Sequence, residues 1–245
     1  MASTPRDRAL ANLSLRDQLR VDRLPQRVAL MMVGLTGFGL SLALLLEAGV
    51  GAAPWDVLHT ALAGLLGTSV GFMSIAVSFM LLLVWIPLRE QVGIGTVSNA
   101  IWVGASIDLG LWLLPSVSGP VAGIGMMLLG VLLNGIFAAV YIGAQLGPGA
   151  RDGLMTGLSR RLGRPVGPVR IVLEIAVLLT GWALGGPLGV GTVVYALGLG
   201  PVIQATLPWV TIPVRTVGGR PVGPAAGTSR DDEDGAGEDP PALPA

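Results

Sequence analysis

Long apolar stretches dominate the chain and are separated by short breaks rich in Gly, Pro and charge. About 20 apolar residues cross the hydrocarbon core of a bilayer as a helix. The uncharged run between Arg27 and Glu47 fits one such helix, and Gly-Thr-Ser at 67–69 divides the longer run from Thr60 to Leu88. The pattern therefore predicts an all-α membrane protein with six spanning helices, at about 28–46, 70–88, 93–114, 121–146, 166–184 and 189–210.

The chain contains this pattern twice, at an offset of 96 residues. Positions 31–108, aligned without a gap on positions 127–204, share 25 identical residues in 78 pairs. Self-similarity of this kind indicates a duplication. Each copy holds three spans, an odd number, so the copies are expected to face opposite ways as two inverted three-helix repeats. The shared positions include an aspartate and a Gly-x-Gly-Thr motif in each copy: Asp56, Asp152, Gly93, Gly95, Thr96, Gly189, Gly191 and Thr192.

Each copy is also expected to hold one extra short helix, interfacial or re-entrant, that opens near its aspartate. In the first copy this helix is predicted at about 55–66. Asp56 is a natural N-cap, because a carboxylate accepts hydrogen bonds from the free N–H groups of a first helical turn. The Gly-x-Gly-Thr motifs are interpreted as helix starts at crowded crossings, since the Lys and the strand of a phosphate-binding loop are absent.

Composition and charge support a membrane location. Hydrophobic residues make up 52% of the chain and charged residues 12%, about half the charged share of a soluble domain. All basic residues are arginines, and with a cytoplasmic N-terminus every one of them lies at the cytoplasmic side, as the positive-inside rule requires. The sequence therefore predicts a membrane protein with both termini in the cytoplasm. Tryptophans are expected at the two interfaces: Trp55, Trp112 and Trp182 outside, Trp85 and Trp209 inside.

These patterns divide the chain into four parts. A basic cytoplasmic segment occupies residues 1–27, the first membrane repeat residues 28–115, and the second, inverted repeat residues 116–210. Residues 211–245 are rich in Gly, Pro and acidic side chains, so they are expected to form a disordered cytoplasmic tail.

Soluble-enzyme chemistry finds little support in the sequence. With no Cys and a single His, neither a zinc site nor a Cys–His pair can be built. Asp56 and His59 stand three residues apart and could exchange a proton. The second copy has Met155 in place of His59, so we interpret the pair as a cap and an interfacial polar residue. No enzymatic activity, cofactor, metal or nucleic-acid partner is expected.

Four charged residues inside the membrane region break the repeat. Glu47 aligns with Gly143, Asp108 with Gln204, Arg170 with Ser74, and Glu174 with Ser78. A central charge in a spanning helix is unfavourable by roughly 2.5–3.5 kcal/mol and is retained mostly for function. We therefore expect these four charged residues to line a substrate or ion pathway. The alternative is structural: Glu174 neutralises Arg170 one turn away, and Asp108 serves packing near an interface.

Several motifs resemble a known family. The segments Pro54-Trp55-Asp56-Val57-Leu58-His59 and Arg151-Asp152-Gly153-Leu154-Met155, with the paired Gly-x-Gly-Thr motifs, resemble the YczE-like bacterial integral membrane proteins, which are related to the YitT group. The likeness covers about residues 30–208. Ala150 stands where a Pro is expected before Arg-Asp-Gly. The resemblance implies a multi-pass bacterial membrane protein and no particular reaction.

Two functions from different classes remain. Inverted repeats with Gly-broken segments are the design of secondary transporters, whose halves rock about a central site, here for an unknown small solute. The alternative is a non-transporting scaffold or accessory protein. Whether Glu174 and Asp108 line a cavity discriminates between them. The expected partners are the lipid bilayer and an unknown small solute, and the oligomeric state is open.

Overall fold

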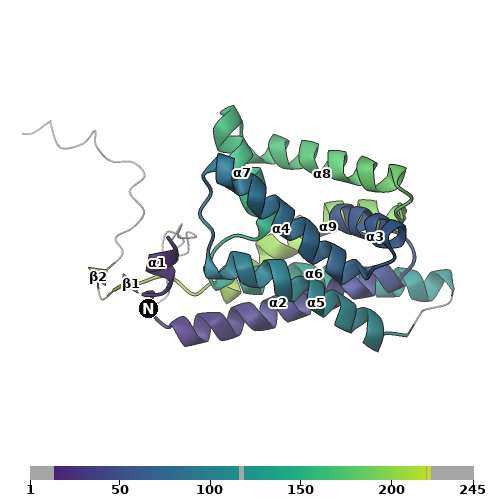
Figure 1. The fold of residues 1–245 in the computed structure, drawn as a ribbon. Helices are drawn as coiled ribbons and strands as arrows, with labels where there is room; N and C mark the ends of the chain where they lie inside the picture. Colours follow the sequence, from purple (N-terminus) through teal and green to yellow (C-terminus); the bar gives the residue numbers. More distant parts are fainter. Residues whose placement is uncertain (1–13, 116–118, 219, 222–245) are drawn as a thin grey trace, which may run out of the picture.

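A computed structural model describes residues 14–115, 119–218 and 220–221 of the 245-residue chain. Helices account for almost all of the regular structure (Figure 1). The elements in chain order are α1 (Leu15–Gln18), α2 (Leu24–Glu47), α3 (Pro54–Leu66), α4 (Val70–Leu88), α5 (Ile94–Leu113), α6 (Pro120–Gly143), α7 (Ala150–Leu162), α8 (Val166–Ala183), α9 (Val190–Val210), β1 (Thr216–Val217) and β2 (Arg220–Pro221).

Six of these helices are long and apolar enough to cross a membrane: α2, α4, α5, α6, α8 and α9. The prediction of an all-helical, multi-pass membrane protein is confirmed. The helix starts also repeat along the chain. The first residues of α2 and α6, α3 and α7, α4 and α8, and α5 and α9 are each separated by 96 residues, the offset of the sequence duplication.

The two short helices, α3 and α7, begin earlier than the sequence predicted. The N-cap position of α3 is Ala53, and no side chain accepts a hydrogen bond there. Pro54 takes the first helical position, which suits proline because that position needs no N–H donor. Asp56 therefore lies inside the first turn and does not cap the helix, so the N-cap prediction was wrong. Asp152 occupies the same third position in α7.

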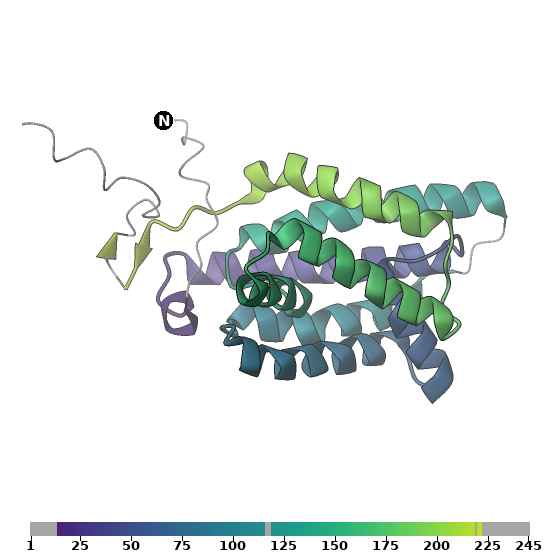
Figure 2. The same ribbon diagram turned by 90° about the horizontal axis from the view of Figure 1, so that it is seen from above.

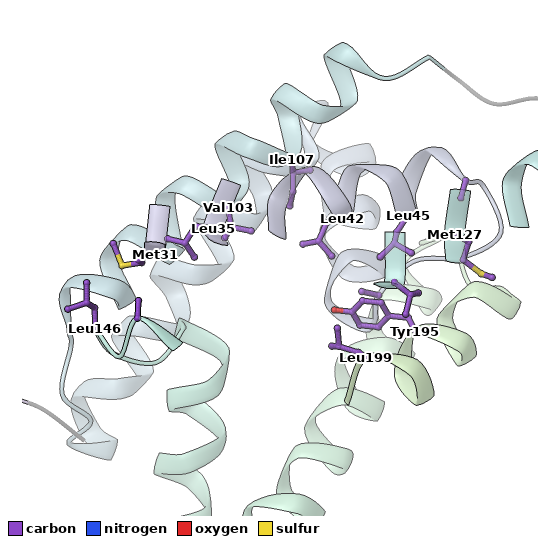
Figure 3. Packing of buried hydrophobic residues seen from close by; sticks show 14 of the residues in the cluster. Met31, Leu35, Leu42, Leu45, Val103, Ile107, Met127, Leu146, Tyr195 and Leu199 are labelled. Atoms are coloured by element: carbon purple, nitrogen blue, oxygen red, sulfur yellow. The ribbon is translucent and has the colours of Figure 1, made fainter. Parts of the chain in front are cut away.

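Helices α2 and α6 pack along each other as the middle pair of a row formed by α5, α2, α6 and α9 (Figure 2). Their contact is reciprocal. A Cβ on Gly34 of α2 would lie 2.8 Å from the Cβ of Tyr141 on α6. In the repeat, Gly34 corresponds to Gly130 and Tyr141 corresponds to Leu45. A Cβ on Gly130 would likewise lie 2.9 Å from the Leu45 side chain. Glycine at both positions lets the two helices approach closely, as small residues do in membrane bundles. Figure 3 shows the apolar core around this contact, including Leu35, Leu42, Leu45, Met127, Tyr195 and Leu199.

Helices α5 and α9 lie on the two sides of this pair, and the other four helices pack mainly on one another. Helix α5 packs on α2 and α9 packs on α6, while α3 packs on α8 and α4 packs on α7. Helix α4 also packs along α5, but α8 and α9 do not pack closely against each other. The two halves therefore share most of their packing and differ at one seam.

Each Gly-x-Gly-Thr motif starts a helix against the loop of the other half. The Gly95 N–H donates to the Leu146 carbonyl oxygen at 2.7 Å, and the Gly191 N–H donates to the Val50 carbonyl oxygen at 2.8 Å. A Cβ on Gly95 would lie only 2.8 Å from the Leu146 oxygen. Both motifs thus lie at crowded crossings, where a side chain would block the backbone hydrogen bond.

Residues 18–27, 87–94, 144–164 and 212–217 meet at one end of the bundle, which we call the arginine end. The Gln18 Oε1 atom accepts from the Ile94 N–H at 2.9 Å, and Arg160 pairs with Glu90 at 2.7 Å. Buried Arg27 donates to three main-chain oxygens of distant segments: Ala144, Ile212 and Pro213. Figure 1 places α1, β1 and β2 at this end and α3 at the opposite end.

The start of the C-terminal segment is tied to this end. Val217 forms a bridge with Val21, and β1 pairs with β2 in a small antiparallel hairpin. Sequence composition did not indicate this attachment, because its bonds come from residues far away in the chain, including Asp22, Arg27, Gly143 and Gln145. The acidic residues of the predicted disordered tail lie outside the described residues.

Trp55 and Trp85 are inside the protein and not at a lipid interface, whereas Trp112, Trp182 and Trp209 are exposed. The Trp85 Nε1 atom donates to the Ala150 carbonyl oxygen at 3.0 Å, and its ring lies against Gly153 of α7. The aromatic-belt prediction was therefore wrong for Trp55 and Trp85, because each is enclosed by helices of both halves.

Candidate functional site

A cavity of about 190 Å³ lies in the middle of the bundle, lined by residues of all eight helices from α2 to α9. Its volume corresponds to about six water molecules at the density of the liquid, so it suits a small solute. We call it the central pocket. Its charged and polar lining residues are Ser74, Ser78, Asn99, Tyr141, Arg151, Asp152, Arg170, Glu174 and Tyr195.

The two halves contribute corresponding positions to the central pocket. Six pairs of lining residues are separated by the repeat offset: Ala53 and Gly149, Trp55 and Arg151, Ser74 and Arg170, Ser78 and Glu174, Asn99 and Tyr195, and Val103 and Leu199. The first half supplies the neutral member of each charged pair, and the second half supplies the charge. Equivalent positions of the two halves thus line the pocket. The charge distribution is asymmetric, because the charged residues of these pairs all belong to the second half.

Arg170 and Glu174, on successive turns of α8, form an ion pair at the edge of the central pocket. The Arg170 Nε atom donates to the Glu174 Oε1 atom at 3.0 Å. The two side chains are 48% and 25% exposed. The predicted neutralising pair is therefore present, and it lies on the predicted cavity. Both residues line the cavity, as the pathway hypothesis expects, and they also pair with each other, as the structural alternative expects. Their part in a pathway stays a prediction.

Arg151 lies at the start of α7 and reaches across to the first half. Its guanidinium carbon is 5.2 Å from the centroid of the Trp55 ring, a cation–π arrangement. Its Nη2 atom is 3.9 Å from Asp56 Oδ1, and its side chain is 21% exposed. The guanidinium makes no hydrogen bond to any residue that the structure describes. Its N–H donors are therefore available to a molecule in the central pocket.

Tyrosines hold the other polar groups of the pocket. The Tyr141 hydroxyl donates to Asp152 Oδ2 at 3.2 Å, and the Tyr195 hydroxyl donates to Asn134 Oδ1 at 3.0 Å. Asn134 in turn donates to the Phe38 carbonyl oxygen on α2. These bonds satisfy buried polar atoms and fix their orientation, as buried networks require.

Asp56 and His59 form a buried pair directly behind Arg151. The His59 Nδ1 atom lies 3.1 Å from Asp56 Oδ1, and both side chains are 1% exposed. The interpretation of His59 as an interfacial residue was wrong, because α3 turns this face toward α8 and the pocket wall instead of toward water. Burial lowers the pKa of His59 from its ordinary value and outweighs the opposing effect of the hydrogen bond to Asp56.

Asp108 and Glu47 do not line the central pocket. The Asp108 carboxylate accepts from the Ser69 hydroxyl at 2.5 Å and from the Gly71 N–H at 2.8 Å. It thereby satisfies a free N–H at the start of α4 and joins α5 to α4. Glu47 is the last residue of α2, at the end of the bundle that lies opposite the arginine end. The sequence could not separate these positions from Glu174, because apparent depth does not tell which face of a helix a residue occupies.

Sequence reasoning missed Trp55, Arg151 and Tyr195 as pocket residues. Arg151 was grouped with the cytoplasmic arginines of its loop, and Trp55 with the interfacial aromatics. A signal was available, since both residues break the repeat at the same aligned position. Among the described residues, no group of three or more His, Asp or Glu side chains could hold a metal ion.

Comparison with known proteins gives the family. Residues 25–208 match the Family of unknown function (DUF6198). The "Uncharacterized membrane protein YczE" of Bacillus subtilis is 34% identical over 172 residues, which cover 70% of this chain and 80% of that protein. The chain belongs to this YczE-like family.

An "Uncharacterized protein" of Haemophilus influenzae is 34% identical over 177 residues, which cover 72% of this chain and 81% of that protein. No solved structure matches the chain. The family match spans all six candidate membrane helices apart from the first residue of α2 and the last two residues of α9, so the central pocket lies wholly within the shared region. The resemblance seen in the short motifs is thus confirmed over most of the chain.

Proposed function

We propose that this protein is a secondary transporter that binds a small polar solute in the central pocket. The observation that carries the proposal is the composition of the pocket wall, in which six pairs of repeat-equivalent residues line one cavity. In transporters built from inverted repeats, the solute site lies between the repeats and each half can move against the other.

The proposal includes an inverted relation between the halves. Each half holds three candidate spanning helices and one short helix, and the short helices α3 and α7 lie toward opposite ends of the bundle (Figures 1 and 2). Residues that touch their own equivalents lie near the axis that relates two repeats. Trp55 and Arg151 are such a pair, and so are Phe38 and Asn134.

The short helices are proposed to be re-entrant elements of the solute site. The first turn of α3 contributes Pro54 and Trp55 to the pocket lining, and the first turn of α7 contributes Arg151 and Asp152. The start of a helix carries a partial positive charge and free N–H groups, which favour an anionic or carbonyl group nearby. Two helix starts that converge on one pocket support binding of a polar solute.

The difference between the halves supports a two-state mechanism. Helix α4 packs along α5, whereas the equivalent helices α8 and α9 do not pack closely. The partly exposed Arg170 and Glu174 lie on α8, on the loosely packed side. We interpret this arrangement as one of two mirror-related states, in which the open seam alternates between the halves. The arginine end is proposed to face the cytoplasm, in the bacterial cell membrane.

Access to the central pocket tests the proposal without knowledge of the solute. The chain has no Cys, so Ser78→Cys places a single thiol in the pocket lining. A transporter exposes this thiol to a membrane-impermeant reagent from each side of a vesicle in turn. Ser106→Cys, buried on α5 away from the pocket, is the matched control and should stay unlabelled. A Ser78→Cys thiol that remains inaccessible from both sides would favour the scaffold alternative.

Solute binding is tested by the melting temperature of purified protein against panels of carboxylates, amino acids, sugars and nucleosides. Any solute that stabilises the protein is then offered as a radiolabelled substrate to proteoliposomes. Arg151→Gln should reduce uptake at least tenfold, since it removes the free donors of the pocket. Arg164→Gln removes an exposed arginine outside the pocket and should leave uptake unchanged. Equal effects of the two variants would contradict the proposed site.

A further inference from the structure

Unpartnered polar atoms are concentrated along one face of α3. Among the described residues, five buried side-chain atoms have no hydrogen-bond partner, and four of them belong to this helix: Trp55 Nε1, Asp56 Oδ2, His59 Nε2 and Thr60 Oγ1. The fifth, Thr192 Oγ1, belongs to the first turn of α9. Buried polar atoms are nearly always hydrogen-bonded, so a cluster of unpartnered ones points to a place where a ligand, water or proton binds.

The Asp56–His59 pair has the chemistry of a proton acceptor. With Nδ1 facing the carboxylate at 3.1 Å, the neutral imidazole carries its hydrogen on Nδ1 and donates it to Asp56 Oδ1. The lone pair of Nε2 is then free, buried and unpartnered. Proton transfer from a hydronium ion to Nε2 breaks one O–H bond, releases a water molecule and forms one N–H bond. The product is an imidazolium that the Asp56 carboxylate stabilises.

Arg151 connects this pair to the central pocket. Its guanidinium is a positive charge 3.9 Å from the Asp56 Oδ1 atom that His59 also contacts, so the two cations compete for one carboxylate. Its free donors face the pocket at the same time. An acidic group bound there would neutralise Arg151 and leave the Asp56 charge to His59.

We propose that Asp56 and His59 form a proton-binding site linked through Arg151 to the central pocket, so that a proton and an acidic group of the solute bind together. This inference rests on the proposed transport function only in naming the proton as the coupling ion. Linkage is reciprocal, so a solute acid that favours protonation of His59 is itself bound more tightly when His59 is protonated.

Other charged groups near the pair are few. Helix α4, which packs on α3, contributes only serines to this side of the pocket, Ser74 and Ser78. Helix α8 contributes Arg170 and Glu174, which neutralise each other. Tyr195 of α9 lies within electrostatic range of Asp56, and Asp152 of α7 is engaged by Tyr141. Arg151, which shares the Asp56 carboxylate with His59, is therefore the cation that acts most directly on His59.

The proton site can be measured without a solute, because the chain contains one histidine. Protein labelled with ¹³C-histidine and purified through a tag without histidine gives one imidazole signal, which is followed by NMR from about pH 4 to about pH 9. Wild-type protein should show one reversible titration. Arg151→Gln should raise its midpoint by about one pH unit or more, because a neighbouring positive charge is removed, and Asp56→Asn should lower it by a similar amount.

Two variants complete the test. Arg164→Gln removes an arginine that does not line the pocket and should leave the midpoint unchanged. His59→Met installs the residue of the other repeat, should fold normally, and should abolish the signal. If Asp56→Asn does not fold, Arg151→Gln alone decides the linkage. A signal that does not move with pH, or a midpoint equally affected by Arg151→Gln and Arg164→Gln, would overturn the proton site and leave the pocket-access result untouched.

Discussion

Arg151 lies over the ring of Trp55, with 5.2 Å between the guanidinium carbon and the ring centroid, and the two residues occupy the same position of the duplicated unit. In the proposed inverted arrangement, residues that touch their own equivalents lie near the axis that relates the two halves. At this aligned position, one copy carries a cation and the other an aromatic ring, and the two attract each other. The contact joins the starts of α3 and α7 at the central pocket.

Replacing Trp55 tests the contribution of this contact to stability. Trp55→Leu removes the aromatic face and should destabilise the protein by about 1 kcal/mol beyond the loss of buried area, whereas Trp55→Phe keeps a ring and should lose less. The melting temperature of the purified protein in detergent measures both. Trp112→Leu, at a strongly exposed position, is the control and should be close to neutral. Equal destabilisation by Trp55→Leu and Trp55→Phe would argue against the cation–π contact.

Gly153 and Gly64 should respond to alanine in opposite directions. A Cβ on Gly153 would overlap the buried ring of Trp85, so Gly153→Ala should destabilise the protein by about 1–3 kcal/mol. Gly64, inside the other short helix, has no atom within 4 Å of a Cβ. Gly64→Ala should therefore stabilise by about 0.5–1 kcal/mol, since alanine suits a helix interior better. The melting temperatures of the two variants are compared with that of the wild type. An unchanged melting temperature in Gly153→Ala would mean that the Trp85 ring can move to make room for the added methyl group.

Asp108→Ala should separate a structural carboxylate from a pathway carboxylate. Its two hydrogen bonds join the starts of α4 and the end of α5, and hydrogen bonds to a charged group contribute about 1.5–3 kcal/mol each. The variant should lower the melting temperature. Ser78→Cys labelling in the same background should be unchanged, because Asp108 does not line the central pocket. If Asp108→Ala changes the labelling of Ser78→Cys without lowering the melting temperature, Asp108 contributes to the pathway after all.

Arg27 should control the attachment of the C-terminal segment. Its guanidinium donates to the carbonyl oxygens of Ile212 at 3.0 Å and Pro213 at 3.0 Å. Arg27→Lys keeps the positive charge, but a lysine ammonium cannot donate to several carbonyl oxygens in the fixed geometry of a guanidinium. The segment from residue 212 onward should therefore become sensitive to limited proteolysis. Arg23→Lys, at an exposed neighbouring position, should leave the cleavage pattern unchanged. Mass spectrometry of the fragments locates the cuts.

Acid sensitivity should depend on His59. Burial lowers its pKa in the folded protein, so between that value and about 6.5, its unfolded value, the unfolded chain binds more protons than the folded one. Stability should therefore fall as the pH drops below about 6.5, by up to about 1.4 kcal/mol per pH unit, until the folded pKa is passed. His59→Met should remove this component. The melting temperatures of wild-type protein and His59→Met are compared from about pH 7 to about pH 5. An equal decrease in both proteins would contradict a contribution from His59.

Local features of the sequence determined the framework of this protein. The six spans follow from the length and apolarity of each segment, which depend on the bilayer and not on neighbouring helices. The 96-residue offset predicted which helices would correspond, and their first residues obey it. The pairing of Arg170 with Glu174 was also predictable, because an i, i+4 contact is set by one turn of a single helix.

Tertiary packing alone decided which polar residues share a site. Asp108 and Glu174 carry the same sequence signal, a carboxylate that breaks the repeat inside a span, yet one holds the start of a neighbouring helix and the other lines the central pocket. The burial of His59 likewise depends on how α3 lies against α8. Each outcome depends on which face of a helix meets which neighbouring helix. That is decided by how the helices pack against one another and not by the order of residues within any one of them.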